Sequence, residues 1–140
     1  MALTPDIGSV EIGGDLDVIA PAEQPTRTYK IDFESGRILG FVDGLEAMRQ
    51  AIYKILRTER FAYLIYSWDY GVELEALFGK SRSVAESELR RVIQEALTAD
   101  SRITDISNFT VTQTERNILH VSFVAHTIFG DVEQETEVTI

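Results

Sequence analysis

Apolar and polar residues alternate one by one along most of the last third of the chain. The final run carries Val132, Gln134, Thr136, Val138 and Ile140 on one face and Glu133, Glu135, Glu137 and Thr139 on the other. A period of two is typical of a strand that buries one face. Similar runs start near Phe109 and Leu119, and turn residues at 115–117 and 129–131 separate the three. We therefore predict an antiparallel three-stranded meander with one polar face.

The middle of the chain follows a helical period instead. Apolar residues recur every three or four positions after Asp43, which predicts an amphipathic helix over 44–57. The same pattern over 83–100 predicts a second helix. Alternation over 29–42, interrupted by turn residues at 34–36, predicts a β-hairpin before both helices. A hairpin, two main helices and a meander together define an α+β fold class.

Residues 1–27 differ in composition from the rest. They hold all three prolines and, before Arg27, only acidic charges. We expect them to form an acidic arm, which is either a disordered tail or an extended arm that orders on a partner. Residues 28–140 are expected to form a single domain, because a chain of 140 residues falls within the usual size of one domain.

The charge of the chain limits the classes of partner that it can bind. With 13 basic and 23 acidic residues, the formal net charge is −10. This charge opposes binding to phosphate backbones and anionic lipids, so we expect no nucleic acid and no membrane as partner. The absence of Cys excludes disulfides and thiolate chemistry. The N-terminus has no signal-like pattern, so we expect the chain to stay where it is made unless it leaves as part of an assembly.

The sequence offers no specific catalytic, cofactor or metal motif. His120 and His126 share one predicted strand, and we interpret both as ordinary sheet residues rather than as parts of a Ser-His-Asp arrangement or a metal site. The enzymatic alternative is a carbohydrate-active, lysozyme-like hydrolase that uses two carboxyl groups. Its candidate acids lie in the irregular aromatic segment 58–80, where Trp68 and Tyr70 could stack on a sugar. These acids are Glu59, Asp69, Glu73 and Glu75.

One stretch carries a family resemblance. It runs Ile55-Leu56-Arg57-Thr58-Glu59-Arg60 and is followed by Tyr70-Gly71 and Leu74. An acid-base pair after a helix, then an aromatic-glycine turn, resembles the small baseplate wedge proteins that initiate the sheath in contractile phage tails and related injection machines. Over 28–140 the chain looks like the XkdS-type branch of this family, which is known from defective-prophage tail operons. It departs from the wider family at 61–69, where relatives often carry a proline and a basic residue.

The resemblance implies a structural, non-enzymatic protein, made in the bacterial host cytoplasm and located in the baseplate of a virion or phage-tail-like particle. Its partners would be other baseplate wedge proteins and the tail sheath protein, and tube or hub proteins are also open as partners. In the family the acid-base pair contacts the helical core bundle of the wedge, which assigns protein binding to Glu59, Arg60, Tyr70 and Gly71. From the residues alone, we expect an exposed pair at positions 59 and 60 that adds about 0 to 1 kcal/mol to stability.

The last predicted strand suggests a second contact. A strand at the edge of a meander leaves backbone N–H and C=O groups free to pair with another chain. Outward glutamates would oppose self-association and favour a basic partner. We therefore expect a sheath strand to dock along 132–140, where the protein-binding residues are Val132, Glu133, Glu135, Glu137, Val138 and Ile140. The alternative is a solvated edge that its charges protect.

Overall fold

The computed structural model of the chain describes residues 25–140. Its elements, in order, are β1 (Thr28–Asp32), β2 (Arg37–Val42), α1 (Gly44–Leu56), the 3-10 helix η1 (Glu75–Leu77), α2 (Arg82–Thr98), β3 (Ile103–Glu115), β4 (Ile118–Thr127) and β5 (Gly130–Thr139). The predicted α+β class is confirmed. The arm expected over 1–27 lies outside the described residues, except for its last three positions.

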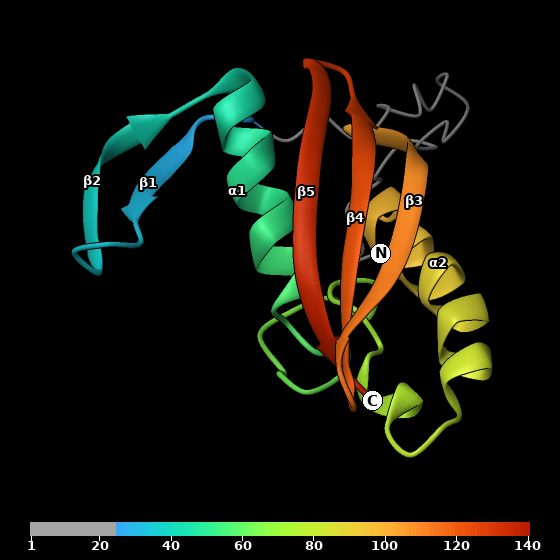
Figure 1. Ribbon diagram of the computed structural model, residues 1–140. Helices are drawn as coiled ribbons and strands as arrows, with labels where there is room; N and C mark the ends of the chain where they lie inside the picture. Colours follow the sequence, from blue (N-terminus) through green and yellow to red (C-terminus); the bar gives the residue numbers. More distant parts are fainter. Residues whose placement is uncertain (1–24) are drawn as a thin grey trace, which may run out of the picture.

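The strands β3, β4 and β5 form one antiparallel sheet in that order. The two long helices lie along this sheet, with α1 beside β5 and α2 beside β3 (Figure 1). The alternation predicted for the last two strands is confirmed by burial. The buried face carries Leu119, Val121, Phe123, Ala125, Val132 and Val138. The glutamates of β5 lie on the opposite face, which remains polar.

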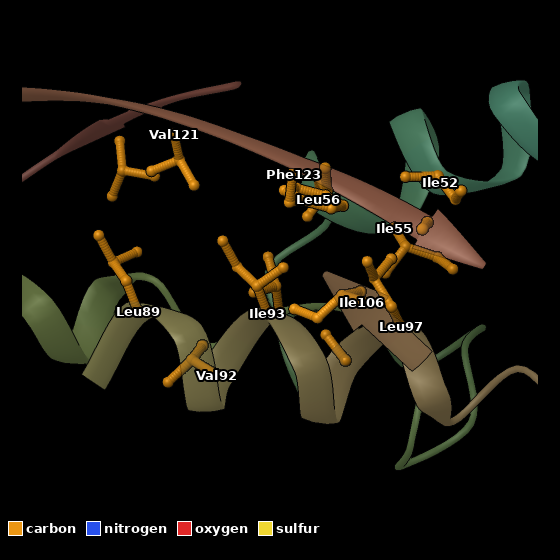
Figure 2. Packing of buried hydrophobic residues seen from close by; sticks show 14 of the residues in the cluster. Ile52, Ile55, Leu56, Leu89, Val92, Ile93, Leu97, Ile106, Val121 and Phe123 are labelled. Carbon is orange, nitrogen blue, oxygen red and sulfur yellow. The ribbon is translucent and has the colours of Figure 1, made fainter. Parts of the chain in front are cut away.

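The hydrophobic core fills the space between the two helices and the sheet. Leu89 of α2 lies opposite Val121 of β4, and Ile55 of α1 lies close to Ile106 of β3 (Figure 2). Most of these side chains are less than 5% exposed. Burying a large aliphatic side chain contributes about 1.5–3 kcal/mol, so this cluster supplies most of the driving force for folding.

Both helices form close to their predicted positions. Helix α1 begins after Asp43, whose carboxylate accepts a hydrogen bond from the Gly44 N–H at 2.7 Å, and it ends at Leu56. Helix α2 begins one residue before the predicted start and ends two residues before the predicted end. The Asp43 side chain thus caps α1, because it gives a hydrogen-bond partner to one of the N–H groups that the first turn leaves free.

The first strand of the meander is longer than predicted. It begins at Ile103 rather than near Phe109, and its pairing with β4 shifts at three places. One of these shifts spans Asn108, which has a φ of 51°. An extra residue at each bulge changes which face the next side chain occupies, so the alternation in sequence is lost while the strand continues.

The hairpin β1–β2 is also confirmed, and it extends away from the sheet on the far side of α1 (Figure 1). Gln50 of α1 holds it in place. Its side-chain amide accepts a hydrogen bond from the Ile31 N–H at 2.9 Å and donates one to the Tyr29 carbonyl at 2.7 Å. An isolated two-stranded hairpin is only marginally stable in water, so this contact and Phe33 packed on Tyr53 position the hairpin.

Candidate functional site

The segment between α1 and η1 closes into a loop whose two ends lie side by side. Val72 N–H donates to the Thr58 carbonyl at 2.9 Å, and Arg60 N–H donates to the Val72 carbonyl at 3.1 Å. Gly71 has a φ of 104°, and a Cβ on it would lie 2.7 Å from the Thr58 oxygen. Glycine tolerates this conformation and leaves room for this approach. The Tyr70-Gly71 turn is therefore required for the loop to close.

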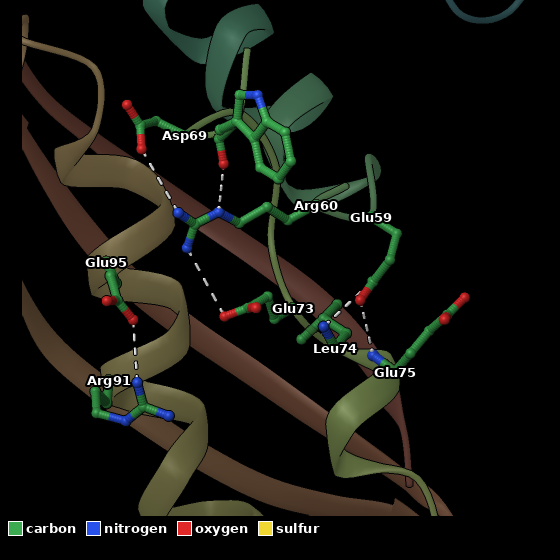
Figure 3. A network of polar contacts seen from close by, with 9 residues as sticks. Glu59, Arg60, Asp69, Glu73, Leu74, Glu75, Arg91 and Glu95 are labelled. Carbon is green, nitrogen blue, oxygen red and sulfur yellow. Dashed lines mark hydrogen bonds and ion pairs between the residues drawn. The ribbon is translucent and has the colours of Figure 1, made fainter. Parts of the chain in front are cut away.

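Glu59 fastens the far end of the same segment. Its two carboxylate oxygens accept hydrogen bonds from the N–H groups of Leu74 (3.2 Å) and Glu75 (3.1 Å) (Figure 3). These amides lie at the start of η1, where backbone N–H groups have no partner within the helix. A carboxylate is favoured at such a position, so Glu59 joins the end of α1 to η1.

Arg60 holds the loop from inside. Its Nε donates to the Trp68 carbonyl at 2.7 Å, and its other nitrogens lie 3.5 Å from Asp69 and 3.8 Å from Glu73 (Figure 3). Its guanidinium also lies 4.7 Å from the centre of the Phe61 ring. The side chain is only 23% exposed. We call residues 61–70 the aromatic loop. Arg60 contacts residues near both ends of this loop and so holds the two ends together.

These contacts correct the expectation of an exposed pair at positions 59 and 60. Glu59 bonds to backbone amides and Arg60 to the aromatic loop, so each has a partner within the chain. Spacing in the sequence could not show this, because the partners lie 8 to 16 residues away. The role of both residues in binding another protein stays a prediction.

Tyr70 completes the base of the aromatic loop. It is partly buried, and its ring stacks on that of Tyr66 with 4.5 Å between centroids. Burial, with a smaller contribution from Tyr66, raises the pKa of the Tyr70 phenol. The phenol therefore stays neutral over the physiological range and acts as a packing group.

The strand β5 is an edge of the sheet, as predicted. Within residues 25–140 it pairs only with β4, in an unbroken register from Ile118↔Thr139 to Thr127↔Gly130. Glu133, Glu135 and Glu137 are exposed. Val132 and Val138, by contrast, are 0% and 2% exposed in the chain's own core, so their side chains do not reach a partner. What β5 offers outward is its free backbone edge and the glutamates, whereas the partly buried Ile140 that follows it packs against the core.

A groove of about 520 Å³ runs along this edge. Tyr53 and Leu56 of α1, with Arg57 just after it, form one wall, and β5 residues 134–137 and 139, with His120 of β4, form the other. Arg57 stacks on Tyr53, with its guanidinium 4.4 Å from the ring centre. The edge of β5 therefore faces a groove that has an aromatic ring and a cation on its opposite wall.

The acids proposed for a hydrolase have structural partners. Glu59 is bound by two backbone amides, and Asp69 and Glu73 both lie beside Arg60. A glycosidase needs one carboxyl group free to give a proton and another free to act as base or nucleophile. This arrangement gives three of the four candidate acids a role in holding the loop.

A second polar arrangement was missed in the sequence. Ser107 Oγ lies 2.7 Å from His126 Nε2, and His126 Nδ1 lies 2.7 Å from Asp131 Oδ1. This order is that of a Ser-His-Asp triad, but acyl transfer also needs a cleft and donors for an oxyanion. The three residues come from β3, β4 and the start of β5 and stand on the sheet face that α1 and α2 leave open. We interpret their two hydrogen bonds as structural contacts that link the three strands.

Two further observations concern the described part of the chain. No group of three or more His, Cys, Asp or Glu side chains in residues 25–140 is placed to hold a metal ion. None of the helices in this range is long and apolar enough to cross a membrane.

The comparisons with known proteins define the class to which this fold and these motifs belong. The family model described as "Contractile injection system sheath initiator" matches residues 27–130, and the chain belongs to this family. It is similar to the phage-like element PBSX protein XkdS of Bacillus subtilis (strain 168), with 40% identity over 139 residues that cover 96% of this chain and 95% of the relative. The resemblance predicted from the sequence is thereby confirmed.

A solved structure is also similar. It is a crystal structure of a Geobacter sulfurreducens protein described as a tail lysozyme, with a TM-score of 0.56, 17% identity, and coverage of 68% of this chain and 89% of that one. At this identity the likeness shows the fold alone. The family and the relative identify a structural component of a contractile tail baseplate, associated with the particle.

Proposed function

We propose that this protein links the inner wedge of the baseplate to the first sheath ring and initiates sheath assembly there. The observation that carries the proposal is the free, regular edge of β5 beside the α1 groove. A strand of the sheath protein would extend the β3–β4–β5 sheet along this edge. Main-chain hydrogen bonds would then supply affinity, and the groove would supply specificity.

The other edge of the sheet is less suitable for this role. The register of β3 shifts at three places, whereas that of β5 does not shift at all. Bulges twist an edge and break its row of N–H and C=O groups, and so protect it from pairing. A straight incoming strand therefore fits β5 and not β3.

The charges on β5 favour a basic strand. Three glutamates face outward from the edge strand, and like charges oppose the pairing of two copies of this chain through β5. Opposite charges on an incoming segment would relieve this repulsion and speed its association. The sheath segment that docks should carry Lys or Arg at alternate positions.

The contact with the wedge is proposed at the other feature described above, the segment that contains Glu59, Arg60, Tyr70 and Gly71. Its shape depends on hydrogen bonds within the chain. In this assignment wedge and sheath contact different surfaces, so one chain can hold both at once. Contacts with tube or hub proteins would be additional to these two.

Hydrogen–deuterium exchange tests the sheath contact directly. Purified chain is compared with and without purified sheath protein, and exchange is followed by peptide. We expect amide exchange within 130–139 to slow by at least about tenfold, because outward N–H groups gain partners. Peptides from β3, the opposite edge, serve as the internal control. Slower exchange in β3 or in the hairpin, with β5 unchanged, would contradict the proposal.

We also propose that the protein is not an enzyme. The acids at 59–75 that would carry hydrolysis have structural partners within the loop. The test is a peptidoglycan turnover assay with the purified protein and its Glu59→Gln variant. No turnover above buffer is expected from either. Turnover that Glu59→Gln abolishes would establish the hydrolase instead.

A further inference from the structure

The tip of the aromatic loop is the most exposed apolar surface in the described chain. Leu64 is 104% exposed, Ile65 is 85% exposed and Trp68 is 80% exposed, and Phe61 and Tyr63 are each more than half exposed. Exposed apolar residues scattered one by one are normal on protein surfaces, but here six large ones, with Tyr66, fall within the eight positions 61–68. Such a cluster, with a Trp in it, is typical of a protein–protein contact.

The loop is also held in one shape. Arg60 bonds to the Trp68 carbonyl, and the rings of Phe61 and Trp68 pack edge to face with 5.7 Å between centroids. Backbone turns at Tyr66 and Tyr70 fold the chain back on itself. A surface that is ordered before binding loses less conformational entropy when it binds. These internal contacts are therefore what we expect of a surface that binds a partner, and not of a flexible surface loop without a function.

One residue in the loop has strained backbone geometry. Phe61 has a φ of 67°, a left-handed conformation that a bulky L side chain rarely adopts. The same residue lies under the Arg60 guanidinium. Strain of this kind persists only where surrounding contacts impose it, and it is concentrated at functional surfaces.

The charges around the tip select the class of partner. Between 58 and 79 the chain has four acids and one base, Arg60, which already has partners within the loop. Asp69 is 81% exposed and Glu73 is 41% exposed beside the tip. An acidic rim repels an anionic bilayer and a second copy of the same loop. It attracts a protein whose apolar pocket is bordered by Lys or Arg.

We propose that the aromatic loop inserts Leu64, Ile65 and Trp68 into an apolar pocket with a basic rim on a neighbouring baseplate protein. This inference rests on the wedge attachment proposed above and names its contact surface and the chemistry of the partner. Glu59, Arg60 and Gly71 are positioning residues in this account, because they set the shape of the loop without forming its tip. The contact residues are thus distinct from the pair that the sequence indicated.

Photo-crosslinking in the assembled particle tests the inference. A photoreactive phenylalanine analogue replaces Ile65, and the matched control carries it at Val84 of α2, which is 42% exposed. After irradiation, crosslinked peptides are identified by mass spectrometry. We expect the Ile65 position to capture one other baseplate protein, at an apolar stretch with Lys or Arg within a few residues, at least about tenfold above the control. Crosslinks to lipid, to a second copy of this chain or to no protein would overturn the inference.

A third position separates this inference from the function on which it rests. The same analogue at Glu135 reports on the β5 edge. If Glu135 captures the sheath protein while Ile65 captures nothing, the chain links to the sheath but the aromatic loop is not its anchor, and only the inference fails. If the chain is absent from purified particles, the proposed function fails as well.

The side chains at the tip can also be tested without a crosslinker. Leu64→Ser with Ile65→Ser removes two apolar groups that are 104% and 85% exposed and contribute little to folding, so the variant should keep its melting temperature. We expect its recovery in particles to fall at least about tenfold, as is typical when contact residues at the centre of an interface are lost. Normal recovery would contradict the inference.

Discussion

The β5 edge and the aromatic loop offer two opposite kinds of contact. At β5 the apolar side chains Val132 and Val138 are buried, and the free groups are backbone amides and carbonyls flanked by glutamates. In the aromatic loop the backbone is held by internal bonds, and the free groups are the side chains Leu64, Ile65 and Trp68. In our proposal, one surface binds through its main chain and the other through its side chains.

This difference has consequences for how each surface can be altered. An edge strand is part of the folded sheet, so its docking groups cannot be removed without the fold, but its charges can be reversed. The loop tip can be truncated freely, whereas its base cannot. Stability should therefore be sensitive at the base of the loop and insensitive at the glutamates of β5.

Gly71→Ala should have the largest effect. The new Cβ would lie 2.7 Å from the Thr58 carbonyl oxygen in a conformation with a φ of 104°. We expect a loss of about 2–5 kcal/mol from the combined overpacking and backbone strain, measured by urea denaturation. Gly79→Ala is the control, because Gly79 has a φ of 77° but no atom within 4 Å of the added Cβ. If the two variants lose equal stability, the close approach at Gly71 is not what fixes the loop.

Arg60→Met should have a smaller effect. It removes the hydrogen bond to the Trp68 carbonyl and the two ion pairs with Asp69 and Glu73. Both ion pairs are partly exposed and therefore contribute little to stability. We expect a loss of about 1–2 kcal/mol, together with faster amide exchange within 61–70. Arg91→Met provides the comparison, since Arg91 and Glu95 form an exposed pair on α2. Equal losses for Arg60→Met and Arg91→Met would show that Arg60 is only a surface residue.

The pair Asp100 and Arg102, between α2 and β3, should make the stability of the protein sensitive to acid. Burial would raise the pKa of Asp100, but hydrogen bonds from Arg102, at 2.6–3.0 Å, outweigh it and leave the pKa lowered. A lowered pKa contributes stability above the ordinary value near 3.8, and this stability is lost as pH falls through the folded value.

The measurement is denaturation of wild type and Asp100→Asn at several pH values. We expect the variant to be about 1 kcal/mol less stable at pH 7. Below about pH 4 the difference should shrink as Asp100 of the wild type takes up its proton. A difference that stays constant down to pH 2 would show that ionisation of Asp100 does not contribute.

The elements with regular spacing could be predicted from the sequence. The period of two in β4 and β5 and the helical period in α1 depend only on neighbours a few residues apart. The first half of β3 could not be predicted, because bulges between Ser107 and Thr110 interrupt the period. The alternation placed Val132 and Val138 on the face expected to be buried, but it did not show that the chain's own core encloses both side chains and leaves neither for a partner.

The two polar networks depend on contacts between distant residues. Ser107 meets His126 only because of the register between β3 and β4, and that register contains shifts. Glu59 meets the amide of Glu75 only after the loop has closed. Aromatic residues such as those of 61–70 are usually expected in a core. Their exposure became clear only from the structure, in which side chains of α1, α2 and the sheet fill the core without them.

Reversal of charge on β5 should change stability least and function most. Glu133→Lys, Glu135→Lys and Glu137→Lys alter exposed side chains and leave the buried alternation intact. We expect each substitution to change stability by no more than about 0.5 kcal/mol. A variant with Lys at Glu34, Glu95 and Glu115, which are exposed elsewhere, carries the same change in charge as a control.

The most direct test of the account is sheath assembly on baseplates that contain the triple β5 variant. Electron microscopy of the particles measures the fraction of baseplates that carry sheath. We predict that the β5 variant joins the baseplate but leaves it without sheath, while baseplates with the control variant carry sheath as the wild type does. Normal sheath on baseplates with the β5 variant would contradict the claim that the β5 edge receives the sheath.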